Sequence, residues 1–244
     1  YKSFRDFFKE KKMHNNYAKL TIKKQRFIGK ADSLTQKYFS EWNDPRIGVR
    51  SAWYVNWDKH AYISLKNNIK HLNMVLPEWF FINPKTDKVE YRIDKQALRL
   101  MRRVGIPILP MLTNNYDSDF HSEAIGRIMR DEKKRMALIN EMVVRCKQYG
   151  FAGVNLDLEE LNIADNEQLN QLVRDFSRIF HAHGLYVTQA VAPFNEDYNM
   201  QELAKYNDYL FLMAYDEHNI ESQPGAVSSQ RWVEKATDWA AKNV

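Results

Sequence analysis

Apolar positions along the chain follow two periods that alternate from residue 47 onward. Short apolar or strictly alternating runs, bounded by turn residues, predict strands. Between them lie stretches with apolar residues three and four positions apart, which predict helices. The predicted strands are 47–57, 72–82, 106–113, 151–159, 186–193 and 209–215, and the predicted helices are 64–70, 95–104, 131–149, 165–183, 200–206 and 230–242. Strands and helices that alternate in this way pair in parallel through right-handed crossovers, so the chain is predicted to have an α/β fold.

The number of strand–helix units bears on which α/β architecture forms. A closed (β/α)8 barrel takes about 250 residues, whereas 198 residues follow residue 46. The alternatives are a barrel without its last two units and an open sheet. We favour the (β/α)8 TIM-barrel type, truncated to about six βα units, because polar residues gather at the carboxyl ends of the predicted strands, where barrel enzymes place their chemistry. These residues are Asn56, Trp57, Asp58, Asn83, Thr113, Asn114, Asp157, Glu159, Gln189, Tyr215 and Asp216.

The N-terminal part differs from the rest of the chain in charge. The whole chain has a net charge of +5, but residues 1–30 carry ten Lys or Arg against Asp6 and Glu10, which leaves −3 for the remainder. We therefore predict a basic appendage or linker over 1–45, helical near 4–12 and 33–42, and a barrel domain over 46–244 whose C-terminal units are missing. No nucleic-acid motif accompanies the basic residues, so no nucleic-acid partner is expected.

Composition also bears on membrane segments, processing and metal sites. No run of about 18 apolar residues is present, so no membrane span is predicted. No signal-peptide pattern is present either, and a chain that opens at Tyr1 is expected to be an excised or processed piece. Cys146 is the only cysteine, which excludes an intrachain disulfide and a thiolate metal site. We expect no metal and no cofactor.

The predicted strand over 151–159 carries the strongest chemical signal. With a period of two, Val154, Leu156 and Leu158 fall on one face, and Gly153, Asn155, Asp157 and Glu159 fall on the other. A parallel strand covered by helices on both faces is normally apolar throughout, so the presence of these carboxylates requires an explanation. One alternative is an edge strand with a solvated outer face.

Asp157 and Glu159 have Cα atoms about 6.5 to 7 Å apart on such a strand. Mutual repulsion and partial burial raise a carboxyl pKa, so one of the two can stay protonated near neutral pH and serve as a general acid. A glycosidase needs such a group. A hard-metal site would also use carboxylates, but no Asp-rich or His-rich loop completes one. Inverting hydrolysis, retaining hydrolysis and attack by an acetamido group of the substrate all remain open at this point.

The segment Ala-Gly-Val-Asn-Leu-Asp-Leu-Glu at 152–159 resembles the fourth-strand signature of glycoside hydrolase family 18, the chitinase family, which is written Asp-x-x-Asp-x-Asp-x-Glu. Met-Ala-Tyr-Asp at 213–216 is similar to the Met-x-Tyr-Asp sequence on the sixth strand of that family. The resemblance covers about 47–244. Over 193–234 it is greatest to domains fused to a polysaccharide deacetylase and a glycosyltransferase in bacterial membrane proteins, which implies a location outside the cytoplasm and those two domains as partners.

The resemblance implies roles for individual residues on an N-acetylglucosamine polymer. Glu159 is expected to protonate the leaving oxygen and then to activate water, while Asp157 holds the N–H of the substrate acetamido group. Tyr215 is expected to donate a hydrogen bond to the acetamido oxygen. The expected substrate-binding residues are Asp216, Asn155, Met213, Gln189, Trp57 and Asn114, and Trp53 and Trp79 are further candidates for stacking on sugar rings.

The chain departs from the family signature at two positions. Ala152 stands in the place of the first Asp and Asn155 in the place of the second. Asn155 can hydrogen-bond Asp157 but supplies no negative charge to modulate its protonation. The leading hypothesis is a substrate-assisted, retaining glycosidase. The alternatives are a polysaccharide-binding domain that does not hydrolyse its ligand and a scaffold that contacts protein partners through the basic arm.

Overall fold

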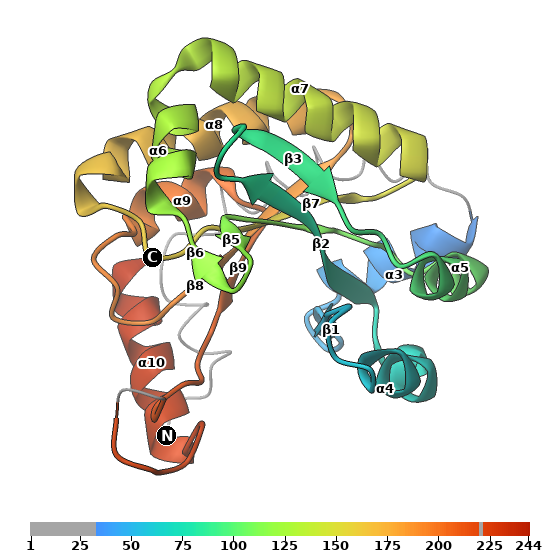
Figure 1. The fold of residues 1–244 in the computed structure, drawn as a ribbon. Helices are drawn as coiled ribbons and strands as arrows, with labels where there is room; N and C mark the ends of the chain where they lie inside the picture. The colour runs from blue at the N-terminus through green and yellow to red at the C-terminus, as the bar shows by residue number, and fades with distance from the viewer. Residues whose placement is uncertain (1–32, 220–221) are drawn as a thin grey trace.

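The computed structural model describes residues 33–219 and 222–244, and the predicted helix near 4–12 lies outside them. The core of the fold is a curled sheet whose parallel strands follow the order β1-β2-β4-β7-β8-β9 (Figure 1). The bounds are Ser51–Tyr54 (β1), Met74–Asn83 (β2), Met111–Thr113 (β4), Gly153–Asp157 (β7), Tyr186–Val191 (β8) and Tyr209–Leu212 (β9). The six predicted strands are all present, so the predicted fold class is confirmed.

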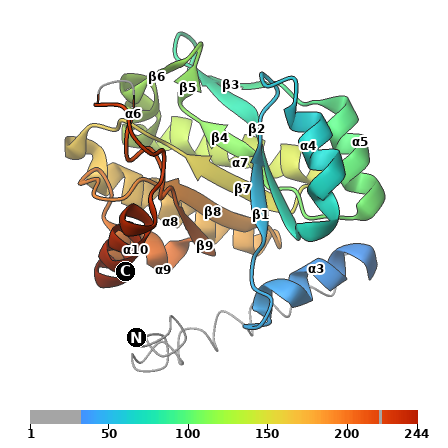
Figure 2. The same cartoon turned by 90° about the horizontal axis from the view of Figure 1, so that it is seen from below.

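Helices connect these strands and cover the outer face of the sheet (Figures 1 and 2). They are α4 (Ala61–Asn68) with η1 (Ile69–His71), α5 (Lys95–Val104), α6 (Ser122–Arg130), α7 (Glu132–Tyr149), η2 (Ile163–Asp165), α8 (Asn166–Ala182), α9 (Met200–Tyr206) and α10 (Gln230–Asn243). The prediction missed α6 and three short strands: β3 (Lys88–Tyr91), which pairs antiparallel with β2, and the hairpin of β5 (Asn115–Tyr116) and β6 (Asp119–Phe120). All of these lie in the connections between the predicted strands and helices, and none is longer than nine residues.

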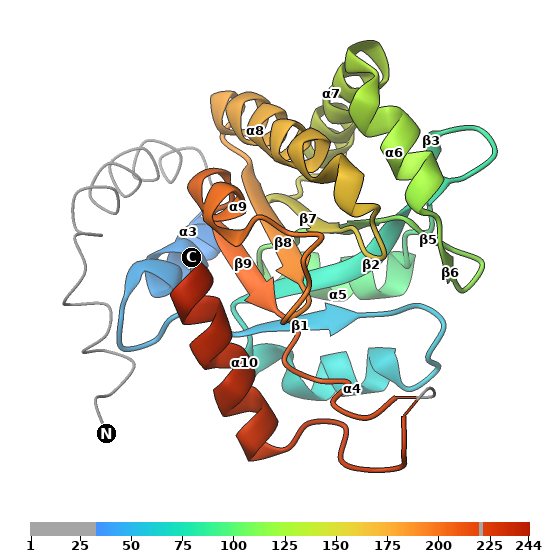
Figure 3. The same cartoon turned by 90° about the vertical axis from the view of Figure 1, so that its left-hand side faces the viewer.

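The sheet curls until its first and last strands approach each other on the concave side (Figure 3). The ring centroids of Trp53 on β1 and Phe211 on β9 are 6.4 Å apart. The convex side packs on the helices through Val75, Leu112 and Leu156, among others. Two faces result: an outer one, buried under helices, and an inner one that encloses the interior of a half-barrel.

Helix α3 (Ser33–Asn43) closes the amino-terminal end of this interior. Phe39 and Trp42 are buried, and both rings contact Tyr186 of β8 at centroid distances of 5.4 and 5.1 Å. The Trp42 indole N–H donates to the carbonyl oxygen of Asn73 at 2.9 Å. The predicted domain division at residue 45 stays a prediction, but α3, which precedes it, packs within the folded body. The carboxyl ends of the strands are therefore the open end of the interior.

Among the described residues, no helix has the length and apolar content that crossing a lipid bilayer requires.

Candidate active site

Strand β7 carries the predicted carboxylates and lies in the middle of the sheet, between β4 and β8. The alternative of an edge strand is therefore wrong. Every residue of β7 is buried. Asn155 lies on the inner face, where its side-chain oxygen accepts a hydrogen bond from the Thr188 hydroxyl of β8 at 2.9 Å. The inner face of β7 thus presents polar groups to the barrel interior while its outer face packs on helices.

Gly153 lets β7 and β8 pair this closely. A Cβ atom at this position would lie 2.0 Å from the carbonyl oxygen of Tyr186. Backbone atoms cannot move away without breaking the parallel pairing of Gly153 with Tyr186. Any side chain at 153 would therefore displace the strand that carries Asp157.

Asp157 ends β7 and is nearly inaccessible, with 6% of its surface exposed. Burial raises the pKa of Asp157 to about 6, and the negative charge of Glu78 raises it further. The hydrogen bond from the Thr113 hydroxyl to the carboxylate acts in the opposite direction and lowers the pKa. Thr113 is the residue that pairs with Asp157 across β4 and β7. Asp157 can therefore exchange a proton close to neutral pH.

Glu159 follows β7 and is half-buried at the open end of the barrel. Burial raises its pKa to about 7, with further contributions from the negative charges of Asp157, Glu160 and Asp216. A carboxyl group with this pKa carries a proton in a large fraction of molecules at neutral pH. It is therefore suited to general acid catalysis.

The backbone around Glu159 is held by two side chains from other parts of the chain, which make three hydrogen bonds. Asn114, directly after β4, accepts a hydrogen bond from the Glu159 N–H at 2.9 Å and donates one to the Glu159 carbonyl oxygen at 2.8 Å. The Tyr198 hydroxyl donates to the Leu158 carbonyl oxygen at 2.9 Å. These contacts fix the backbone from which the Glu159 side chain extends.

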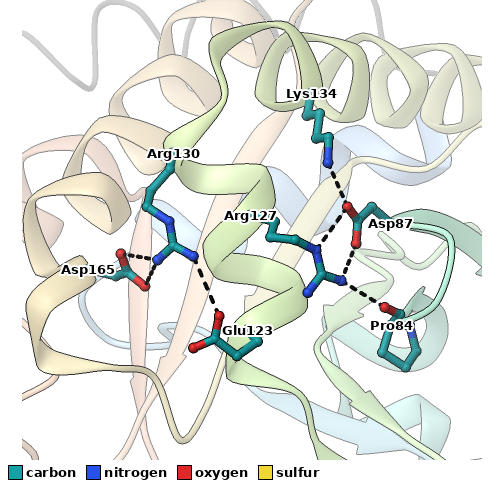
Figure 4. Close-up of polar contacts among 7 residues, drawn as sticks. All are labelled: Pro84, Asp87, Glu123, Arg127, Arg130, Lys134 and Asp165. Carbon is teal, nitrogen blue, oxygen red and sulfur yellow. Dashed lines mark hydrogen bonds and ion pairs between the residues drawn. The ribbon is translucent and has the colours of Figure 1, made fainter.

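The segment that contains Glu159 is also anchored further along the chain, at Asp165, where η2 ends. A guanidinium N–H₂ of Arg130 on α6 lies 2.7 and 2.6 Å from the two carboxylate oxygens of Asp165 (Figure 4). Arg130 also faces Glu123 at 3.6 Å. A parallel set of ion pairs joins Arg127 and Lys134 to Asp87 in the β2–β3 turn, at 2.7 and 2.8 Å (Figure 4). Helix α6, which the sequence did not predict, thus anchors both the Asp165 end of this loop and the β2–β3 turn.

Tyr215 and Asp216 follow β9 and face the same end of the barrel. Burial raises the pKa of Tyr215 to about 12, with additional effects of the charges of Asp157, Glu159 and Asp216. Its hydroxyl therefore keeps its proton and remains a hydrogen-bond donor at physiological pH. The Tyr215 ring meets Trp53 of β1 edge-on at 6.0 Å. Asp216 is exposed and has a positive φ of 56°.

Three predicted substrate-binding residues make contacts within the protein. Gln189 is on the outer face of β8, where its side-chain oxygen accepts a hydrogen bond from Asn207 at 3.1 Å, so it does not line the interior. Asn114 is fully buried, and its amide is used on the Glu159 backbone. Met213 is buried, and its N–H donates to the Val191 carbonyl oxygen at 2.9 Å. Gln189 is therefore corrected to the outer face of the sheet, while substrate binding by Asn114 and Met213 stays a prediction.

The three candidate stacking tryptophans have different surroundings. Trp79 is fully buried between the sheet and the helices, against Tyr54 and Phe151, so its candidacy as a stacking residue is wrong. Trp53 on the inner face of β1 is 38% exposed, and Trp57 beyond the end of β1 is 78% exposed. The two tryptophans that can meet a sugar ring are therefore both on or next to β1.

The sequence reasoning missed Glu78, which lies on β2 and faces the interior. The register of β2 on β4 shifts between Glu78 and Phe80, so Glu78 and Phe81 face inward while Trp79 and Phe80 both face the helices. Burial raises the pKa of Glu78, whereas the hydrogen bond from Trp57 and the positive charge of Arg92 lower it. The sequence signal that could have identified Glu78 is that it is a carboxylate inside an otherwise apolar predicted strand.

Comparison with known protein families agrees with this geometry. The profile of the family described as "Glycosyl hydrolases family 18" matches residues 35–243. The chain is 21% identical to the uncharacterized glycosylase YvbX of Bacillus subtilis over 202 residues, which cover 78% of this chain and 58% of YvbX. It is 31% identical to the cortical fragment-lytic enzyme of Bacillus subtilis over 130 residues, which cover 49% of this chain and 30% of that enzyme.

Solved structures show the same fold. A crystal structure of a chitinase from Chromobacterium violaceum superimposes with a TM-score of 0.72 at 22% identity, covering 80% of this chain and 64% of the chitinase. The chain thus spans less than two thirds of the length of each of these relatives.

Proposed function

The chain belongs to family 18 of the glycosyl hydrolases, and from this premise we propose that it cleaves an N-acetylglucosamine-containing polysaccharide with retention of configuration, through attack by the substrate's own acetamido group. The observation that carries the proposal is the pair Asp157 and Glu159, both raised in pKa at the open end of the half-barrel. A relative named as cortical fragment-lytic and a structural neighbour named as a chitinase support this class of substrate.

Glu159 acts first as the general acid. Its carboxyl group donates a proton to the glycosidic oxygen as the bond from that oxygen to the anomeric carbon breaks. The acetamido oxygen of the same sugar forms a new bond to the anomeric carbon and produces an oxazolinium ion. Glu159, now a carboxylate, then accepts a proton from the water that opens this ring, which restores the acid and returns the original configuration.

Asp157 and Tyr215 stabilise the acetamido group during these steps. The Asp157 carboxylate accepts the N–H of the acetamido group and so offsets the positive charge that develops on it. The Tyr215 hydroxyl, which keeps its proton, donates to the acetamido oxygen. Asn155 beneath Asp157 is neutral, and the carboxylate that acts electrostatically on Asp157 from another strand is Glu78.

The test is incubation of the protein with N-acetylglucosamine oligomers, followed by mass spectrometry. Wild type and Glu160→Gln are expected to shorten the oligomers, because Glu160 is the exposed neighbour of the catalytic acid. Glu159→Gln is expected to leave them intact. Cleavage by Glu159→Gln at the wild-type rate would refute the role of Glu159. Intact oligomers with folded wild type would overturn the proposal and favour a polysaccharide-binding domain, which calorimetry with the same oligomers would detect.

A proposal for the cellular setting rests on the resemblance of 193–234 to domains of larger membrane proteins. We propose that this domain lies outside the cytoplasm in one chain with a polysaccharide deacetylase and a glycosyltransferase domain. Protease added to intact spheroplasts is expected to remove the domain from the full-length protein. Full protection until lysis would contradict this location.

A further inference from the structure

Trp57 is an exposed indole on a well-anchored loop. Its side chain is 78% exposed, although burying a large aromatic ring normally contributes to stability. The residue stands between β1 and α4, beside the open end of the barrel. Hydrophobic burial therefore gives no reason for the ring to be where it is.

The loop around Trp57 is held on both sides. The side-chain oxygen of Asn56 accepts a hydrogen bond from the Trp79 indole at 3.0 Å, and its amide donates to the Arg92 carbonyl oxygen. On the other side, the Asp58 carboxylate accepts the His60 N–H at 2.8 Å. The backbone of Trp57 is thus fixed to the core and to the β3–α5 connection independently of its own ring.

The ring itself is held by Glu78. The Trp57 indole N–H donates to a carboxylate oxygen of Glu78 at 2.9 Å. Glu78 projects from the inner face of β2, and its charge acts on Asp157 from there. Arg92 is the cation that acts on Glu78. One carboxylate therefore faces both the exposed indole and the carboxylate that is expected to hold the substrate.

We propose that Glu78 is a positioning residue that holds the Trp57 indole as a platform for a sugar ring at the rim of the active site. Stacking on an aromatic face requires a fixed ring plane, and an exposed tryptophan without a tether rotates about two side-chain bonds. A hydrogen bond from the indole to a charged acceptor supplies the tether. The inference rests on the proposed function, because it assumes that a polysaccharide occupies the site.

The test is a double-mutant cycle on cleavage of N-acetylglucosamine oligomers, with KM and kcat measured separately. Glu78→Leu removes the acceptor, and Trp57→Phe keeps an aromatic ring but removes the N–H. Each is expected to raise KM about tenfold, and the KM of the double variant is expected to be no higher than that of either single variant. Trp57→Phe is expected to keep kcat within about threefold, whereas Glu78→Leu is expected to change kcat as well, because it also removes the charge that acts on Asp157. Glu78→Gln keeps an oxygen acceptor and is expected to restore KM to within about threefold of wild type.

Two results would overturn the proposal. One is additivity of the two single variants, and the other is a wild-type KM for Trp57→Phe beside a raised KM for Glu78→Leu. Thermal unfolding of all variants identifies any change due to loss of fold. Should wild type bind oligomers without cleaving them, the same cycle on the calorimetric dissociation constant tests the tether, so failure of the proposed hydrolysis and failure of the tether are distinguished.

Discussion

Replacement of the proposed catalytic acid is expected to stabilise the fold at alkaline pH. Glu159 has an ordinary pKa of 4.5 when unfolded and a pKa of about 7 in the folded protein. The folded state therefore binds this proton more tightly than the unfolded state. Between those two pH values the folded state holds more protons, so stability falls as pH rises through this window. Glu159→Gln carries the neutral form at every pH and escapes this loss.

The size of the effect follows from the two pKa values. They differ by about 2.5, and each pKa unit corresponds to about 1.36 kcal/mol, so the full penalty at about pH 8 is about 3 kcal/mol. Asp157 shares the repulsion and Glu159 retains partial contact with solvent, which reduce the amount assigned to Glu159 alone. We expect Glu159→Gln to exceed wild type in free energy of unfolding by about 1 to 3 kcal/mol at about pH 8 and by nothing measurable at about pH 4.

Urea denaturation followed by circular dichroism at both pH values measures this difference. The control is Glu234→Gln, an exposed glutamate on α10 whose side chain accepts a hydrogen bond from Gln230 that a glutamine can also accept. It is expected to change the free energy of unfolding by less than about 0.5 kcal/mol at either pH. An equal difference between Glu159→Gln and wild type at the two pH values would refute the raised pKa and with it the electrostatic argument for Glu159 as an acid.

Four further outcomes are expected. Activity should fall as pH rises through about 7, because cleavage starts from protonated Glu159; a rate that stays constant to about pH 9 would contradict this. Asn114→Ala leaves the buried N–H and carbonyl of Glu159 without these partners, and should lower the free energy of unfolding by about 2 to 4 kcal/mol and kcat by about 100-fold in the oligomer assay. Trp42→Ala should lower the free energy of unfolding by about 3 to 5 kcal/mol, since its ring is buried against the sheet; a loss below about 1 kcal/mol would show that α3 is dispensable. Gln189→Leu should leave KM within about twofold of wild type because the side chain faces the helices, whereas a tenfold rise in KM would return it to the substrate site.

The sequence pattern was sufficient to predict the order of the strands along the chain and which side chains of β7 share one face. Alternation over 153–159 predicted which side chains share a face, because strand geometry projects successive residues to opposite sides. The agreement of polar residues at several strand ends predicted the end of the barrel where the site lies. Asp157, Glu159 and Tyr215 are at that end in the structure, and their catalytic roles stay proposals.

The sequence pattern did not decide which face of the sheet Gln189 and Glu78 occupy. Both faces of a parallel sheet inside an α/β fold are buried, so polarity does not tell the inner face from the outer one. The register shift between Glu78 and Phe80 then changes the face within a single strand. A prediction made from the sequence period assumes that the strand contains no such irregularity.

What the sequence determined by itself was local: the period of each element, the family signature and the residue types that the chemistry needs. Only the tertiary structure decided which of those residues meet. Asn114 reaches Glu159, and Trp57 reaches Glu78, across separations of 45 and 21 residues. Such contacts arise from the curl of the sheet and the packing of its loops, which depend on all strands together and leave no periodic trace in any one segment.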